Sequence, residues 1–222
     1  MIVDPASDAL LLVDLQPDFM PGGTLAVAHG DEVVAPAAAL ARAFRTVVAT
    51  QDWHPRGHVS FASAHPARKP YETLELPHGS QVLWPDHCVQ GSRGAALHPG
   101  VPDEALTLVL RKGTRREVDS YSAFRENVGP DGRRPTTGLG AWLKARGMRR
   151  VFVCGLARDF CVRWSAEDAA AEGLETIVLD DLTRAVFPDR SAETDAALAA
   201  AGVRVACSAD LERSSPNLRR PT

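Results

Sequence analysis

The chain has 222 residues and a formal net charge of −3 at pH 7, with acidic and basic residues interspersed. It therefore has no basic stripe for nucleic acid, and its longest apolar runs are strand-sized, too short to cross a membrane. One core can be buried at this length and no linker divides the sequence. We expect a single domain over residues 1–222, without nucleic-acid or membrane partners.

The four cysteines are scattered along the chain and form no CxxC pair. This spacing indicates neither a disulfide framework nor a zinc ribbon. The N-terminus also lacks a basic region followed by a long apolar segment, the pattern of a secretory signal. We therefore expect reduced thiols and a cytoplasmic protein.

The first predicted elements are a strand over 9–14, which ends on Asp14, an Ala-rich helix over 31–44 and a strand over 46–50. The segment from Pro55 to Pro102 follows; it is rich in Pro, Gly, Ser and His and has no sustained period. A long structureless segment inside a compact domain is usually functional. We expect an excursion over about 51–102 that forms a metal and substrate site.

The second half of the chain returns to alternating strands and helices. Val151 to Cys154, a break containing glycine and a run with helical spacing from Asp159 to Glu172 predict a strand, a sharp turn and a helix. The other predicted elements are a strand over 106–110, a helix near 138–146, a strand over 175–179, a helix near 191–201 and a strand over 203–207.

This alternation predicts an α/β fold of three layers, in which a mostly parallel sheet carries helices on both faces. In open sheets of this kind, ligands bind beyond the carboxyl ends of the strands. Four chemically active residues lie at or just past such ends, and we expect them to converge: Asp14, Asp52, Lys112 and Cys161.

Three of these residues form a plausible nucleophilic set. Cys161 falls in the first turn of its predicted helix, where unpaired N–H groups and the helix dipole lower a thiol pKa from about 8.5 toward neutrality. Asp14 is placed to take the thiol proton, and Lys112 to lower the pKa of both groups. Each residue alone has an ordinary structural explanation, but the three strand ends together favour catalysis.

A second cluster has the composition of a metal site. Asp52, His54 and His58 form a D-x-H-x3-H pattern directly after a strand, and His87 lies further along the chain. One carboxylate with three imidazoles suits Zn²⁺, with Mn²⁺ and Fe²⁺ as alternatives. A solvated loop would explain any one of these residues, whereas the pattern as a whole favours one divalent metal ion.

Three aromatic residues lie in loops near these groups, and they are placed to sandwich a flat ring: Phe19, Trp84 and Tyr121. Core packing explains each of them alone about as well.

With these residues assembled, the chain resembles the nicotinamidase (pyrazinamidase/nicotinamidase) branch of the isochorismatase-like cysteine hydrolases. Isochorismatases proper lack the nucleophilic cysteine and the D-x-H…H metal set, so the match favours the amidase branch. The resemblance spans about residues 10–185. The matching stretches are 13–19 (VDLQPDF), 50–55 (TQDWHP) with His58 and 60–62 (SFA), 84–89 (WPDHCV), 112–113 (KG), 155–162 (GLARDFCV) and 179–183 (LDDLT).

The resemblance implies that Cys161 attacks the carboxamide of nicotinamide after Asp14 takes its proton, and that Lys112 offsets the resulting charges. Ammonia leaves, and hydrolysis of the thioester gives nicotinate, a reaction of NAD salvage. The backbone N–H groups of Ala157 and Cys161 would form the oxyanion hole, next to a cis peptide between Leu156 and Ala157.

The resemblance also implies that Asp52, His54, His58 and His87 hold a metal that binds the pyridine nitrogen. The ring would lie between Phe19 and Trp84, with Leu156 and Tyr121 as further substrate contacts. Arg158 departs from the small residue common at this position in related sequences, and we expect its side chain to point away. The loop 114–120 is variable in the family and has no expected role.

Two alternatives stay open. A related amidase acting on a carbamoyl or ureido substrate would use the same Asp14, Lys112 and Cys161, but such relatives generally lack the metal set. A non-catalytic metal-binding protein would have an inert Cys161. The expected partner is a small molecule, and the sequence leaves open whether the chain forms a homo-oligomer.

Overall fold

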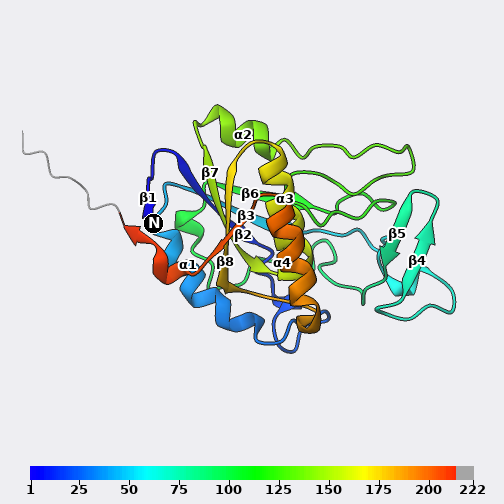
Figure 1. The fold of residues 1–222 in the computed structure, drawn as a ribbon. Coiled ribbons are helices and arrows are strands. Elements are labelled where there is room, and N and C mark those ends of the chain that lie inside the picture. Colours follow the sequence, from blue (N-terminus) through cyan, green and yellow to red (C-terminus); the bar gives the residue numbers. More distant parts are fainter. Residues whose placement is uncertain (214–222) are drawn as a thin grey trace, which may run out of the picture.

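A six-stranded sheet, with strand order β6-β3-β2-β7-β8-β9 and every pairing parallel, lies at the centre of the computed structural model (Figure 1). The structure describes residues 1–213. All six residues of the inner strand β2 are buried, as expected for an apolar run covered on both faces. The strands of this sheet are β2 (Asp8–Val13), β3 (Thr46–Asp52), β6 (Leu108–Lys112), β7 (Arg150–Leu156), β8 (Glu175–Arg184) and β9 (Arg204–Ala206).

Helices cover both faces of the sheet, which confirms the predicted three-layer fold. In β2, Leu10 and Leu12 belong to the core under α1, whereas Leu11 belongs to the core under the other three helices. Alternate side chains of a strand point to opposite faces, so one apolar run supplies both cores. None of the helices described is long and apolar enough to cross a membrane. The helices are α1 (Val34–Ala41) on one face and α2 (Leu139–Ala145), α3 (Arg163–Ala171) and α4 (Ser191–Ala200) on the other.

The order in which the chain adds strands to the sheet reverses direction between β2 and β7. The chain builds β2, β3 and β6 outward to one edge and then returns to β7, on the other side of β2. Such a switch point is where open parallel sheets bind ligands, beyond the carboxyl ends of the strands. The four converging residues predicted from the sequence lie at or just past the ends of β2, β3, β6 and β7.

Gly155 allows β7 to lie against β2 at this switch point. Its φ is 115°, and a Cβ atom there would overlap the carbonyl oxygen of Val13. Left-handed conformations of this kind favour glycine.

We expect Gly155→Ala to lower the free energy of unfolding by about 2 kcal/mol or more, because backbone strain and overlap with a neighbouring strand add together. Gly132→Ala is the matched control: its φ of 71° is also left-handed, but no atom lies within 4 Å of the added methyl. Urea denaturation of both variants measures the difference. Equal losses would mean that the contact with β2 costs nothing.

The excursion over 51–102 contains a regular element that the sequence analysis missed. An antiparallel hairpin, β4 (Thr73–Leu76) and β5 (Gly79–Val82), stands away from the main sheet (Figure 1). The expectation of a structureless segment is therefore wrong here. Each strand has four residues, too few for a period to be distinguished from loop sequence.

Other differences concern element ends. β8 continues beyond its predicted end through Asp180 and Asp181 to Arg184, with a register shift against β7. Charged residues interrupt the apolar pattern there, so the sequence signal stops before the strand does. A second pair of strands that was not predicted, β1 (Ile2–Val3) and β10 (Glu212–Arg213), joins the two ends of the described chain.

Candidate active site

Asp14, Asp52, Lys112 and Cys161 meet in one buried cluster, as their positions at strand ends predict. The Lys112 ammonium lies at the centre. Its Nζ is 2.9 Å from Asp14 Oδ2 and 2.5 Å from Asp52 Oδ1, and it donates to Cys161 Sγ at 3.3 Å. One cation therefore contacts two carboxylates and a thiol.

Thr50, a residue that the sequence analysis did not single out, fixes the Asp14 carboxylate. Its hydroxyl donates to Asp14 Oδ1 at 2.6 Å and accepts the Asp14 N–H at 3.0 Å. Asp14 has a left-handed backbone with φ 47° just past β2. β3 contains other polar residues, so no local pattern singles out Thr50.

The protonation of this cluster differs from the expectation for Cys161. Burial raises the pKa of the Cys161 thiol well above its usual range, and the Asp14 carboxylate adds to this effect against the opposing charge of Lys112. The expectation of a thiol pKa near neutrality is therefore wrong: burial between carboxylates outweighs the helix terminus and the ammonium. Burial also raises the pKa of Asp14, opposed by Lys112.

Lys112 itself stays charged. Burial would lower its pKa, but Asp14 and Asp52 outweigh burial and raise it well above the usual value. The cluster therefore holds an ammonium, a protonated thiol and a carboxylate that is more basic than an exposed aspartate.

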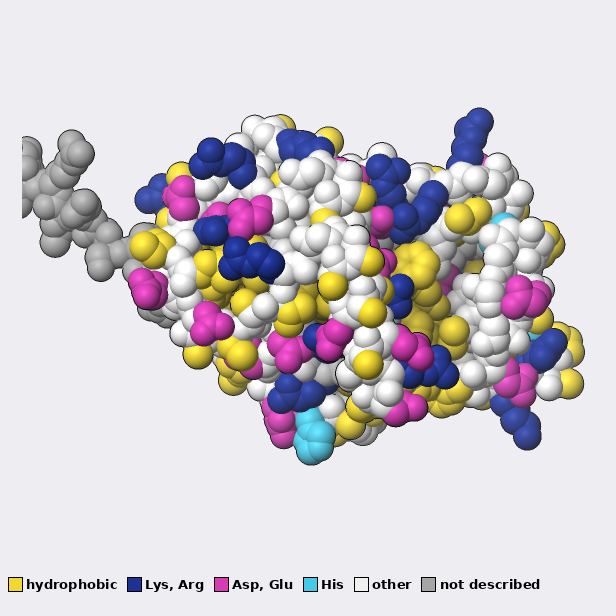
Figure 2. Space-filling view, in the orientation of Figure 1, with side chains coloured by type: hydrophobic (Ala, Val, Ile, Leu, Met, Phe, Trp, Pro, Cys, Tyr) yellow, Lys and Arg dark blue, Asp and Glu magenta, His cyan; other side chains and the backbone are white. Residues whose placement is uncertain are grey.

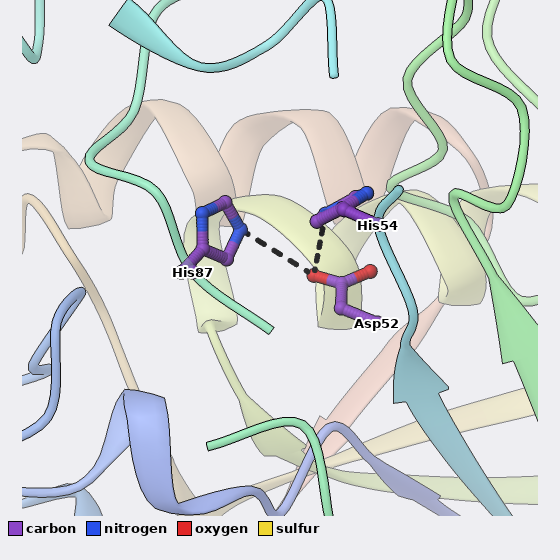
Figure 3. A group of neighbouring side chains, drawn as sticks. All are labelled: Asp52, His54 and His87. Carbon is purple, nitrogen blue, oxygen red and sulfur yellow. Dashed lines mark ion pairs between the residues drawn. The ribbon is translucent and has the colours of Figure 1, made fainter. Parts of the chain in front are cut away.

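Asp52, His54 and His87 form the neighbouring group (Figure 3). His54 Nε2 is 3.7 Å and His87 Nε2 is 3.9 Å from Asp52 Oδ2. The Nδ1 atoms of the two histidines bond backbone carbonyls, of Gly113 at 2.9 Å and of Pro85 at 2.8 Å. Because Nδ1 must carry a proton to donate these bonds, Nε2 is the atom of each ring that faces Asp52 Oδ2, a geometry that suits a divalent cation.

The pKa values of the two histidines shift in opposite directions, and only the shift of His87 favours the neutral imidazole that a metal ion binds. Burial lowers the pKa of His87 to about 4. Burial would lower the pKa of His54 as well, but the Asp52 carboxylate outweighs it and raises that pKa. Lys112 and His54 hold the pKa of Asp52 well below its usual range despite burial. A metal ion would take the place of a proton on His54.

His58 lies beside this group rather than in it. Its ring is 4.2 Å from that of His54 between centroids, and both its nitrogens already bond protein atoms: Ser60 Oγ at 2.7 Å and the Val118 carbonyl at 3.1 Å. His58 shares a second candidate group with His54 and Asp119. The four-residue ligand set thus stays a prediction, in which the His58 ring would have to leave Val118.

Asp119 is a site residue that the sequence did not indicate. It is buried, and its carboxylate accepts hydrogen bonds from the Ser120 N–H at 2.8 Å and the Gln81 side chain at 2.9 Å. A single aspartate in a polar loop has no distinguishing pattern.

A pocket opens onto both groups of residues, since Cys161 and the Asp52–His54–His87 group line it together. Figure 2 shows hydrophobic side chains gathered between the α3–α4 side of the molecule and the β4–β5 hairpin. The aromatic lining includes the predicted Phe19, Trp84 and Tyr121, and Phe160, which was not predicted.

Leu156 is not part of this lining. Its side chain is fully buried in the core under α1, because it is an inward-facing residue of β7. The expected substrate contact at Leu156 is therefore not supported, and Ala157 lines the pocket instead.

The turn between β7 and Cys161 has the expected form. The Leu156–Ala157 peptide is cis, and the Ala157 carbonyl accepts the N–H groups of Phe160 and Val162, both at 3.1 Å, in a π-helical turn (Arg158–Val162). Arg158 points away from Cys161, as expected, and pairs with Asp180 at 2.7 Å and Asp195 at 2.8 Å.

Comparison with known proteins agrees with this geometry. The Isochorismatase domain family model matches residues 8–210. A nicotinamidase of Acinetobacter baylyi is 48% identical over 178 residues, which are 80% of this chain and 81% of that protein.

Two solved structures are similar over nearly their whole length. A protein of L. infantum in complex with nicotinate is 40% identical with a TM-score of 0.83, covering 96% of this chain and 98% of that one. A pyrazinamidase of Pyrococcus horikoshii in complex with zinc is 32% identical with a TM-score of 0.71, covering 90% and 99%.

Proposed function

The chain belongs to the isochorismatase family, and from this premise we propose that it acts as a nicotinamidase, hydrolysing nicotinamide to nicotinate and ammonia. The observation that carries the proposal is a single pocket that is lined by Cys161 and by the Asp52–His54–His87 group. Cys161 also contacts Lys112 behind this lining. The nicotinate bound to the L. infantum relative supports the substrate class.

In the proposed reaction, Asp14 takes the thiol proton as the sulfur of Cys161 adds to the carboxamide carbon. The C–N bond then breaks, Asp14 passes the proton to the departing nitrogen, and ammonia leaves a nicotinoyl thioester. Water gives a proton to Asp14 and adds to the thioester; the C–S bond breaks, the sulfur regains the proton and nicotinate leaves. The raised pKa of Cys161 supports proton transfer during attack rather than a standing thiolate.

The Lys112 ammonium would stabilise the negative charge on the Asp14 carboxylate and on the Cys161 sulfur throughout the reaction. Its contacts with Asp14 at 2.9 Å and Cys161 at 3.3 Å support this role. The backbone N–H groups of Ala157 and Cys161 would stabilise the tetrahedral oxyanion. Support comes from the position of both residues in the pocket lining.

We propose Asp52, His54 and His87 as ligands of one divalent metal ion, Zn²⁺ first, with His58 as the fourth ligand once its ring leaves Val118. The ion, when bound, would supply a Lewis-acid partner for the pyridine nitrogen and so orient the ring. Phe19, Trp84 and Tyr121 would enclose the ring. The zinc in the Pyrococcus horikoshii relative supports the choice of metal.

The biological setting that we propose is NAD salvage in the cytoplasm. All four cysteines are free thiols in the structure, which suits a reducing compartment.

An ammonia-release assay tests the function. We expect purified protein to release ammonia from nicotinamide, and from an N-carbamoyl amino acid at a much lower rate. The reverse preference would identify the related carbamoyl amidase. Release from neither substrate by metal-loaded, folded protein would indicate a non-catalytic metal-binding protein.

We expect chelation to reduce nicotinamide turnover by about 100-fold or more, since misplacing a substrate by about 1 Å can cost that factor. Re-addition of Zn²⁺ should restore the rate, and metal analysis should give about one ion per chain in the restored protein. Circular dichroism of the stripped protein controls for unfolding. Full turnover after removal of the metal would contradict the proposed orienting role.

A further inference from the structure

The β4–β5 hairpin buries one strand side chain fully, and that side chain is polar, whereas Val82 beside it packs partly buried against the core under α1. Of its strand residues only Gln81 is buried, with 6% of its surface exposed. A buried amide requires hydrogen-bond partners. A hairpin that stands away from the sheet (Figure 1) would more simply be held by an apolar residue, so the partners of Gln81 are informative.

Those partners lie on the wall of the active-site pocket. Gln81 Nε2 donates to Asp119 Oδ2 at 2.9 Å and lies 3.3 Å from the Tyr121 hydroxyl oxygen, with a further bond of 2.8 Å to the Val82 carbonyl. Carboxylate and carbonyl oxygens accept only, so the amide nitrogen, and not its oxygen, must face them. The orientation of Gln81 is thereby fixed.

The short segment 119–121 connects this contact with substrate space. Asp119 and Tyr121 both line the pocket, and the Tyr121 hydroxyl also accepts from Trp84 Nε1 at 3.3 Å. Ser120, between them, uses its carbonyl to accept from Lys112 at 3.0 Å. Among the described residues, Gln81 makes no hydrogen bond to Asp14, Lys112 or Cys161, so it contacts the pocket wall and not the reacting groups.

We propose that Gln81 is a positioning residue for substrate binding, which holds Asp119 and Tyr121 in the pocket wall and so couples the hairpin to the active site. This inference rests on the proposed nicotinamidase function. Without the amide, Asp119 loses a donor and turns, and the Tyr121 hydroxyl loses its neighbouring amide group and keeps the contact with Trp84. The pocket then fits the pyridine ring less well, while the reacting groups keep their contacts.

Kinetics of Gln81→Leu and Gln81→Glu test the proposal. Leucine removes the donor at similar size, and glutamate puts a carboxylate against Asp119. We expect KM for nicotinamide to rise about tenfold, equivalent to about 1.4 kcal/mol, while kcat changes less than about threefold. Because KM need not equal Kd, calorimetric binding of nicotinamide to metal-loaded Cys161→Ala, with and without Gln81→Leu, should show the same factor.

A polarity exchange separates positioning from general damage. In Gln81→Glu with Asp119→Asn, the amide and the carboxylate change places, so the hydrogen bond between the two side chains forms in reverse, while the bond to the Val82 carbonyl stays lost. We expect the KM of this double variant to fall below that of Gln81→Glu and to approach that of Asp119→Asn alone. Glu75→Gln, at an exposed position on β4, is the matched hairpin control and should leave KM and kcat unchanged.

The outcomes are distinct. Lower thermal stability with unaltered KM and Kd, or no recovery in the double variant, would assign Gln81 a merely structural role and overturn the proposal. Should Gln81→Glu fail to fold, Gln81→Leu provides the same comparison. Failure of the wild-type protein to hydrolyse nicotinamide would instead refute the proposed function, whatever the Gln81 variants do.

Discussion

Cys161→Ala should reduce ammonia release from nicotinamide by more than about 1000-fold, because no other group is proposed to form the acyl bond and removal of a nucleophile costs losses of this order or greater. The Asp14–Lys112 ion pair should persist, since alanine only shortens the side chain beside it. Metal content and the far-UV spectrum should therefore match those of the wild-type protein.

Cys154→Ala is the matched control for this experiment. Cys154 is also a buried free thiol, on β7, but it belongs to the core under α1 and does not line the pocket. Burial raises its pKa to about 12, so it has no reactive form near neutrality. More than a small fraction of residual activity in Cys161→Ala would exclude Cys161 as the nucleophile and direct attention to Cys88, which lies next to His87.

Lys112→Met should have the second largest effect, a loss of kcat of about 10²–10⁴-fold together with lower stability. The methionine keeps much of the length and removes the charge, which leaves Asp14 and Asp52 as buried carboxylates without their shared cation. Breaking a buried ion pair in this way costs about 3–5 kcal/mol. Single-turnover rates and urea denaturation measure the two effects separately.

Adding Asp14→Asn distinguishes the electrostatic cost from the chemistry. The double variant removes one uncompensated carboxylate, so we expect part of the stability to return while kcat stays as low as in Lys112→Met. Recovery of kcat together with stability would mean that Lys112 and Asp14 serve the fold and not the reaction.

The stability contributed by Lys112 has a defined pH dependence. Its pKa in the folded protein is raised well above 10.5, so its contribution is fully present below that value and is lost as pH rises through the folded pKa. Asp52 has a lowered pKa and the opposite behaviour: its contribution is present above pH 3.8 and is lost as pH falls through the folded pKa.

The parts of the site that the sequence could predict are those fixed by strand ends. Asp14, Asp52 and Lys112 each lie at or just past the end of a predicted strand, and parallel strands bring their carboxyl ends to one edge whatever the details of packing. The fold class was predictable for the same reason, since alternating strand and helix patterns admit few other arrangements.

The remaining features depend on contacts between distant residues. Gln81 meets Asp119 across 38 positions, and Thr50 meets Asp14 across 36, so no local pattern announces either bond. The direction in which the pKa of Cys161 shifts depends on the depth of burial and on the neighbouring carboxylates, which a helix position alone does not specify. His58 fitted a ligand spacing, but its two hydrogen bonds came from loops that the pattern did not describe.

The position of β2 between β3 and β7 has a consequence for synthesis of the chain on the ribosome. β2, β3 and β6 can pair as soon as they emerge, but the other side of β2 stays open until β7 is made, with register Asp8 to Arg150. An exposed apolar edge of this kind is prone to pair with other chains. Because β7 also leads to Cys161, the nascent protein cannot become active before this edge of β2 is covered, and catalytic activity in a refolding experiment reports that β7 has paired with β2.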